Sequence, residues 1–266
     1  MNQIHALQLD IVWRDKSKNF SRIYELLQKL IQSKSNLNYG DLLVLPEMFA
    51  TGFDVEYGAL AEGEGFHLEE TDEFLSECAK KFQIYIQGSG IGRDSEQNKR
   101  RNLVRVFNPE GQVIASYQKI HPFSFGGEHK RFSSGEEVVI YEWNGFKVAP
   151  IICYDLRFPE LFRKAVDLGA TLFCVVANWP SPRQTHWKPL LQARAIENQA
   201  VVLGVNRSGQ DQFLEYLGAS VLFDEYGKEL ACLDQKESFL SHELSPKNVR
   251  VWRDKFPALK DRKDWL

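Results

Sequence analysis

The sequence predicts a layered α/β domain whose sheets mix parallel and antiparallel strands. Strand-sized apolar segments alternate with segments of helical period along most of the 266 residues. Hairpin-like turn sequences interrupt this alternation, and no internal repeat, low-complexity tract or linker divides the chain. With 43% apolar residues, a chain of this length can bury a large core as one domain.

The first half of the chain supplies five predicted strands and two predicted helices. Strands are predicted over residues 4–13, 41–45, 84–87, 102–107 and 112–120. Helices are predicted over 18–30 and 69–82, because each places apolar residues on one face at a helical period. Between the last two strands, Asn108-Pro-Glu-Gly111 is typical of a hairpin turn, since Pro and Gly occupy positions that turns favour.

The second half continues the alternation and ends in an aromatic-rich tail. Strands are predicted over 146–152, 171–177 and 200–206, helices over 160–168 and 186–198, and a strand pair around 224–227. We divide the chain into a domain over 1–245 and a tail over 246–266. The tail is charged but carries Val251, Trp252, Phe256, Leu259 and Trp265. We therefore expect it to pack on its own domain or on a partner subunit.

The composition argues against several classes of protein. The net charge is −3 with acidic and basic residues interspersed, so neither a nucleic-acid nor a membrane surface is indicated. The N-terminus lacks the layout of a signal peptide, and the apolar runs are too short to span a membrane. Cysteines stand at positions 78, 153, 174 and 232, without a Cys-x-x-Cys pair. We therefore expect a cytoplasmic protein with free thiols.

Cys153 occupies the position of a nucleophile. The apolar run over 146–152 predicts a strand, a polar turn follows the cysteine, and Pro159 suits the first turn of a helix. A strand, a turn and a helix with a nucleophilic side chain at the tip form a nucleophile elbow, here with Cys in place of Ser. The alternative is that Cys153 is a small buried apolar residue, the commonest role of a free cysteine.

Glu47 and Lys119 also stand at the ends of predicted strands, where open α/β sheets place functional groups. Taken singly, Glu47 could cap a turn and Lys119 could be a surface lysine. Together with Cys153 they make chemical sense. A thiol needs a base, an enclosed carboxylate can take its proton, and an ammonium can stabilise an oxyanion. The set suffices for acyl transfer from an amide, so no metal and no cofactor is expected.

Three segments carry a resemblance to a known family. They are Leu45-Pro-Glu-Met-Phe49, Tyr117-Gln-Lys-Ile-His121 and Cys153-Tyr-Asp-Leu-Arg-Phe-Pro-Glu160. Their order resembles that of the nitrilase, or carbon–nitrogen hydrolase, superfamily, with similarity from about residue 4 to about 243. The resemblance implies a four-layer αββα sandwich with mixed sheets and a catalytic triad of Glu47, Lys119 and Cys153. It also implies a second glutamate, matched by Glu128. We predict that the Lys119 ammonium and the backbone N–H of Tyr154 form the oxyanion hole.

The segment that begins at Cys153 differs between branches of this superfamily. Here it reads Cys-Tyr-Asp-Leu-Arg-Phe-Pro, which is similar to the branch that contains the ω-amidases, as are residues 177–183 and 186–198. The resemblance implies hydrolysis of the terminal amide of 2-oxoglutaramate and 2-oxosuccinamate. Pro122 departs from the pattern, since many ω-amidases have leucine there. The alternatives are another carbon–nitrogen hydrolase activity, such as N-carbamoyl or small aliphatic amide hydrolysis, or a non-catalytic scaffold.

A substrate of this class carries a carboxylate far from the reacting amide, and arginine can hold it with two hydrogen bonds. We predict that Arg183 does so, although a surface loop arginine is an equal alternative. Phe123 and Trp179 are predicted to form apolar walls. Arg157 is predicted to be structural, paired with Asp155 or Glu160. The family further implies a homodimer or higher homo-oligomer, with the helices after Cys153 and the tail as the candidate interface.

Other interpretations fit the sequence less well. Residues 88–92, Gly-Ser-Gly-Ile-Gly, resemble a dinucleotide-binding loop, but Arg93 stands where its last glycine is required and no helical pattern follows. The six histidines show no zinc-binding spacing. A Cys–His protease would leave Glu47 and Lys119 unexplained.

Overall fold

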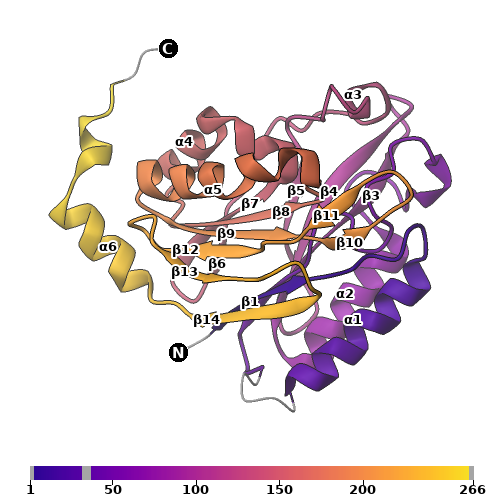
Figure 1. Ribbon diagram of the computed structural model, residues 1–266, viewed down its shortest axis with the longest axis horizontal. Helices are drawn as coiled ribbons and strands as arrows, with labels where there is room; N and C mark the ends of the chain where they lie inside the picture. The colour runs from indigo at the N-terminus through magenta and orange to yellow at the C-terminus, as the bar shows by residue number, and fades with distance from the viewer. Residues whose placement is uncertain (1–2, 32–36, 264–266) are drawn as a thin grey trace.

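Two six-stranded sheets pack face to face in the computed structural model, which describes residues 3–31 and 37–263 (Figure 1). In order across the first sheet, its strands are β14 (Ser238–Glu243), β1 (Gln3–Gln8), β2 (Leu42–Val44), β3 (Tyr85–Asp94), β4 (Lys99–Phe107) and β5 (Val113–Gln118). In order across the second, they are β13 (Glu229–Cys232), β12 (Val221–Phe223), β9 (Val201–Asn206), β8 (Leu172–Ala177), β7 (Phe146–Ile152) and β6 (Tyr141–Trp143). A separate ribbon consists of β10 (Ser208–Gln210) and β11 (Glu215–Leu217).

Both sheets are mixed, as the sequence predicted. The strands β1, β2 and β3 are parallel, as are β7, β8 and β9, and the remaining pairs are antiparallel. Helices α1 (Lys16–Ile31) and α2 (Glu69–Phe82) cover the first sheet, and α4 (Pro159–Asp167) and α5 (Gln184–Asn198) cover the second (Figure 1). The remaining helices are α3 (Glu128–Arg131), α6 (Pro246–Lys255) and the short 3₁₀ helices η1 (Gly58–Leu60), η2 (Cys153–Arg157), η3 (Ser181–Arg183) and η4 (Ala258–Asp261). The predicted αββα sandwich is therefore confirmed.

The central strand β7 shows how one apolar run serves two layers of core. Successive side chains of a strand point to opposite faces. Val148 and Ile152 enter the layer between the sheets, while Ala149 and Ile151 face α4 and α5. A strand that is buried on both faces reads as continuously apolar rather than alternating, which is the pattern of this segment.

The strand β3 is longer than the sequence predicted, because it continues through the glycine-rich segment to Asp94. A side chain at Gly88 would come within 2.8 Å of Leu75 and Phe49, and one at Gly90 within 2.8 Å of Leu68. The glycines therefore allow neighbouring side chains, including Leu75 of α2, to pack directly on the strand. In contrast, β1 ends at Gln8 and not at residue 13.

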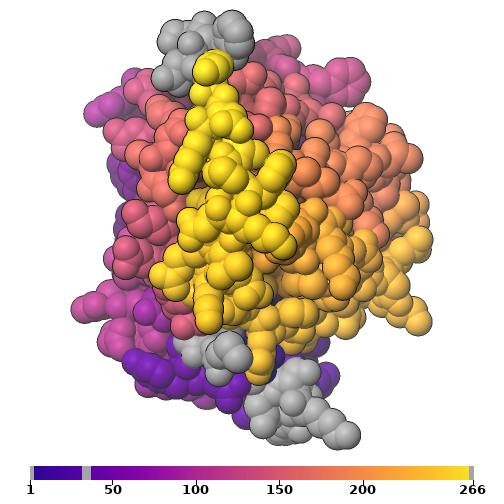
Figure 2. Space-filling model, turned by 90° about the vertical axis from the view of Figure 1, so that its left-hand side faces the viewer, coloured from indigo at the N-terminus to yellow at the C-terminus, as the bar shows by residue number. Residues whose placement is uncertain are grey.

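The tail packs on its own chain through α6. Val249 is buried, and the Arg253 guanidinium donates hydrogen bonds to the carbonyls of Ala170, Asn198 and Gln199. Figure 2 shows the tail as a strip along one face of the molecule. Trp265, which the sequence assigned to the same packing, lies outside the described residues. Within those residues, no helix combines the length and the apolar character that crossing a membrane would need.

Candidate active site

Cys153 stands at a sharp turn between strand and helix. Strand β7 ends at Ile152, and Cys153 has a φ of 46°, which is the left-handed region that non-glycine residues seldom adopt. The turn η2 follows at once, and α4 begins at Pro159. This geometry has the form of the nucleophile elbow that the sequence predicted, and Cys153 lines a cavity.

Glu47 is fully buried and has hydrogen-bond donors on both carboxylate oxygens. Its Oε1 accepts from Asn102 Nδ2 at 2.8 Å and from Lys119 Nζ at 3.1 Å. Its Oε2 accepts from the backbone N–H of Asn178 at 2.9 Å, and the Asn178 side chain donates to the Glu47 carbonyl. Because Glu47 follows β2 and Asn178 follows β8, these bonds join the two sheets.

Lys119 follows β5 and places its ammonium between two carboxylates. Its Nζ lies 3.1 Å from Glu47 Oε1 and 2.8 Å from Glu128 Oε2, and the side chain is almost completely buried. Burial disfavours the ammonium, but the negative charges of Glu128 and Glu47 outweigh it and raise the pKa of Lys119 above its usual value. Glu128 is the first residue of α3 and also accepts from the backbone N–H of Phe123 at 2.6 Å.

The surroundings of Cys153 favour its neutral thiol over the thiolate. Burial and then the charge of Glu47 raise the pKa of Cys153 well above its usual range; Lys119 opposes the shift, and Glu128 adds to it. A thiol with a raised pKa can attack only if a neighbouring base takes its proton. Glu47 is the carboxylate beside it that can do so.

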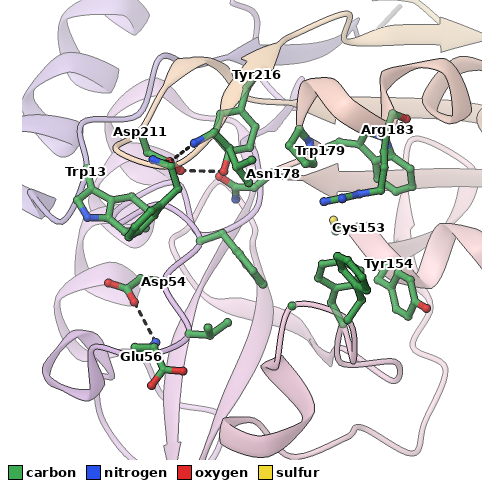
Figure 3. A pocket seen from close by; sticks show the side chains of 18 of the residues that line it. Trp13, Asp54, Glu56, Cys153, Tyr154, Asn178, Trp179, Arg183, Asp211 and Tyr216 are labelled. Carbon is green, nitrogen blue, oxygen red and sulfur yellow. Dashed lines mark hydrogen bonds between the residues drawn. The ribbon is translucent and has the colours of Figure 1, made fainter.

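The cavity in front of Cys153 has a volume of about 370 Å³ (Figure 3). The predicted residues Lys119, Phe123, Tyr154, Trp179 and Arg183 all line it together with Cys153. Figure 3 shows the Arg183 side chain directed into the cavity near Cys153. The guanidinium carbon lies 5.2 Å from the centre of the Phe123 ring. Trp179 donates from its ring nitrogen to the Arg183 carbonyl at 2.8 Å, which holds the loop that presents the arginine.

The contacts of Arg157 differ from those that the sequence predicted. Asp155, which was expected to pair with it, instead accepts hydrogen bonds from the Tyr117 hydroxyl and from both the backbone N–H and the ring of His121. The Arg157 guanidinium lies 4.8 Å from the Trp179 ring centre and lines the cavity. The elbow turn therefore uses Asp155 to bind the segment after β5, which leaves Arg157 facing the cavity.

The sequence did not identify Asn102 and Asn178 as site residues, although both hold Glu47. Neither amide titrates, and each acts through a contact between strands that are distant in sequence. The wall opposite Cys153 was also not identified. Trp13 and Tyr216 lie across the cavity from Cys153 in Figure 3, and Phe53, Phe213 and Leu214 also line the cavity.

Known proteins resemble this chain over its full length. The family model described as carbon-nitrogen hydrolase matches residues 3–254. The chain is 35% identical to the 2-oxoglutaramate amidase of Bacillus subtilis (strain 168) over 263 residues, which cover 98% of each chain. It is 34% identical to the omega-amidase YafV of Escherichia coli (strain K12) over 261 residues, which cover 97% of this chain and 96% of that relative.

Among solved structures, the chain resembles XC1258 of Xanthomonas campestris, a CN-hydrolase superfamily protein with an arsenic adduct in its active site. The TM-score is 0.89 at 33% identity, and the match covers 100% of this chain and 98% of the other. These relatives confirm the resemblance to the superfamily and its ω-amidase branch that the sequence motifs indicated.

Proposed function

Because this chain belongs to the carbon–nitrogen hydrolase family, we propose that it is a cysteine-dependent ω-amidase. It would hydrolyse the terminal amide of small 2-oxo-dicarboxylic acid monoamides, 2-oxoglutaramate and 2-oxosuccinamate, to the 2-oxo acid and ammonia. The observation that carries the proposal is the buried set of Glu47, Lys119 and Glu128 beside the Cys153 thiol. Full-length relatives named as amidases of this kind support the choice of substrate.

In the first half of the reaction, the sulfur of Cys153 attacks the amide carbon while Glu47 takes the thiol proton. The carbonyl oxygen becomes an oxyanion, which the Lys119 ammonium and the backbone N–H of Tyr154 stabilise. When the intermediate collapses, the C–N bond breaks and Glu47 passes its proton to the departing nitrogen. Ammonia leaves, and the acyl group stays on sulfur as a thioester.

In the second half, water attacks the thioester carbon and Glu47 accepts a proton from that water. The C–S bond then breaks, the 2-oxo acid leaves, and the proton held by Glu47 returns to the sulfur. Each group ends in its starting state. Glu128 takes no proton in this scheme, because its contacts to Lys119 and to the Phe123 N–H hold the ammonium and the cavity loop in place.

Two arginines support recognition of a substrate carboxylate. Arg157 and Arg183 both line the cavity. Each guanidinium lies over an aromatic ring, that of Trp179 or Phe123. Arg157 Nη2 also lies within hydrogen-bonding distance of His186 Nδ1, at 3.2 Å. Because a guanidinium has five N–H donors, either arginine keeps donors with which it can bind the distal carboxylate.

The test is a comparison of substrates and of arginine variants. Ammonia release should show a much higher kcat/KM for 2-oxoglutaramate than for β-ureidopropionate or a simple aliphatic nitrile. Arg183→Met should raise KM steeply for 2-oxoglutaramate but barely change the kinetics of a short uncharged amide. Arg157→Met tests the second arginine in the same way. Arg250→Met, on the exposed side of α6, is the control and should leave KM unchanged. Preferred hydrolysis of β-ureidopropionate would instead indicate an N-carbamoyl hydrolase.

We further propose a homodimer that covers an apolar patch formed partly by the tail. The patch includes Ile196, Tyr226, Val251 and Phe256, each about half exposed. The Tyr226 ring lies 4.3 Å from that of Trp252, which in turn stacks on Phe256 at 5.2 Å, so these three rings are contiguous. The Ile196 side chain lies against Gly227, next to Tyr226 in sequence, and Val251 precedes Trp252 on α6. Contiguous exposed apolar side chains are a common feature of protein interfaces.

We also propose a cytoplasmic location, because a reducing compartment keeps the thiol of Cys153 available for attack. Recovery of the protein in a secreted or membrane fraction of the cell would contradict it.

A further inference from the structure

The side-chain amide of Asn102 lies between the two buried glutamates. Its Nδ2 donates to Glu47 Oε1 at 2.8 Å and to Glu128 Oε1 at 3.0 Å, and Asn102 is 1% exposed. An amide nitrogen carries two hydrogens, so each carboxylate receives one. Only the nitrogen can face two ionised carboxylates, because the amide oxygen is itself an acceptor. The orientation of the side chain is thereby fixed.

Asn102 is held in turn by its strand. It shares the inward face of β4 with Val104, because side chains alternate along a strand. Its backbone carbonyl accepts from the backbone N–H of Lys119 at 2.9 Å, and its Oδ1 accepts from the Ser89 hydroxyl at 3.5 Å. One residue therefore contacts Glu47, Glu128 and the backbone of Lys119 at once.

The charges of the site explain why an uncharged donor stands here. Two carboxylates and one ammonium leave the buried cluster with one negative charge in excess. The Asn102 amide gives each carboxylate one hydrogen bond without adding positive charge. A cation at this position would compete with Lys119 for the carboxylates. An apolar residue would leave each buried carboxylate one donor short and free to move.

We propose that Asn102 is a positioning residue, which holds Glu47 in line with Cys153 and Glu128 against Lys119. This role presupposes the amide hydrolysis proposed above. It goes beyond that proposal because it assigns the placement of the base to a residue that takes no part in the bonds made and broken.

The main test compares Asn102→Leu and Asn102→Gln with wild type. Asn102→Leu keeps the branching of the side chain, although leucine is larger, and it removes both donors. The kcat for 2-oxoglutaramate should therefore fall at least about tenfold, with KM nearly unchanged. Asn102→Gln retains the amide and should retain more of kcat.

The control is Val104→Ala on the same strand. It removes buried packing, so it should lower the stability to urea while leaving kcat nearly unchanged. A wild-type kcat in folded Asn102→Leu would overturn the proposal. If Asn102→Leu does not fold, Asn102→Ala decides, because it removes both donors without adding bulk. A kcat lowered at least about tenfold with KM nearly unchanged supports the role, and a wild-type kcat contradicts it.

A second readout separates this inference from the choice of substrate. Alkylation of Cys153 by iodoacetamide, followed by mass spectrometry of the peptide, needs no amide substrate. It should be slower in Asn102→Leu at neutral pH, because the base that takes the thiol proton is impaired. If 2-oxoglutaramate is not hydrolysed but this difference persists, the substrate proposal fails and the role of Asn102 stands. Equal alkylation rates in wild type and Asn102→Leu would contradict the positioning role of Asn102.

Discussion

Lys119 neutralises one of two buried carboxylates, and this pairing can be tested through stability. Lys119→Met leaves Glu47 and Glu128 with uncompensated charge, which should cost roughly 3–5 kcal/mol in the free energy of unfolding. Adding Glu128→Gln removes one of those charges. The double variant should therefore recover at least about 1 kcal/mol relative to Lys119→Met.

Urea unfolding of the single and double variants measures this coupling. Both should lose roughly 10²–10³ in kcat, because the ammonium that we propose as an oxyanion donor is absent from both. Lys188→Met is the control, since its pair with Glu229 is exposed and should contribute under about 1 kcal/mol. Equal stability of the single and double Lys119 variants would show that the lysine does not couple the two glutamates.

The residues that sequence reasoning identified are those whose chemistry is visible in their type. Glu47, Lys119 and Cys153 are ionisable groups placed after apolar strands, and the structure brings them together. Asn102 and Asn178 could not be recognised in this way. An asparagine in a strand or a loop is ordinary, and its role appears only when a carboxylate from another strand is seen within hydrogen-bonding distance.

At the scale of elements, α6 presents part of the apolar patch proposed as a dimer interface. Val251→Glu and Ile196→Glu place charge on side chains that are half exposed, so the monomer should fold normally. Each should shift the protein from dimer to monomer at micromolar concentration in light scattering. Ile114→Glu, on a strand of the other sheet, is the control and should leave the dimer intact. A monomeric wild-type protein would contradict the interface.

Elements with strong local patterns could be predicted, and those defined by distant partners could not. The boundaries of α2 and β7 agree with the sequence because helical period and a continuous apolar run are local signals. The strand β14 is polar in part and owes its conformation to pairing with β1, from the opposite end of the chain. The extension of β3 was missed because glycine disfavours strands locally, whereas here it admits close side-chain packing.

At the scale of the whole molecule, the site is built across the junction of the sheets. Glu47, Asn102 and Lys119 come from the first sheet, and Cys153 and Asn178 come from the second. Packing between the sheets therefore sets the separation of Glu47 and Cys153. From the sequence, the meeting of these residues at one site was predicted only through the family resemblance of the motifs. The wall that includes Phe213 and Leu214 depends on the β10–β11 ribbon, which has no comparable motif.

The central claim is that Cys153 forms a thioester with the acyl group of a 2-oxo-acid amide. The most direct test mixes the enzyme with 2-oxoglutaramate, quenches it in acid within one turnover, and examines the peptide that contains Cys153 by mass spectrometry. We expect an adduct with the mass of the acyl group on that peptide, together with ammonia release in the first turnover. Cys153→Ala should show neither, with its fold unchanged by circular dichroism. Ammonia release at the wild-type rate from Cys153→Ala would contradict the account.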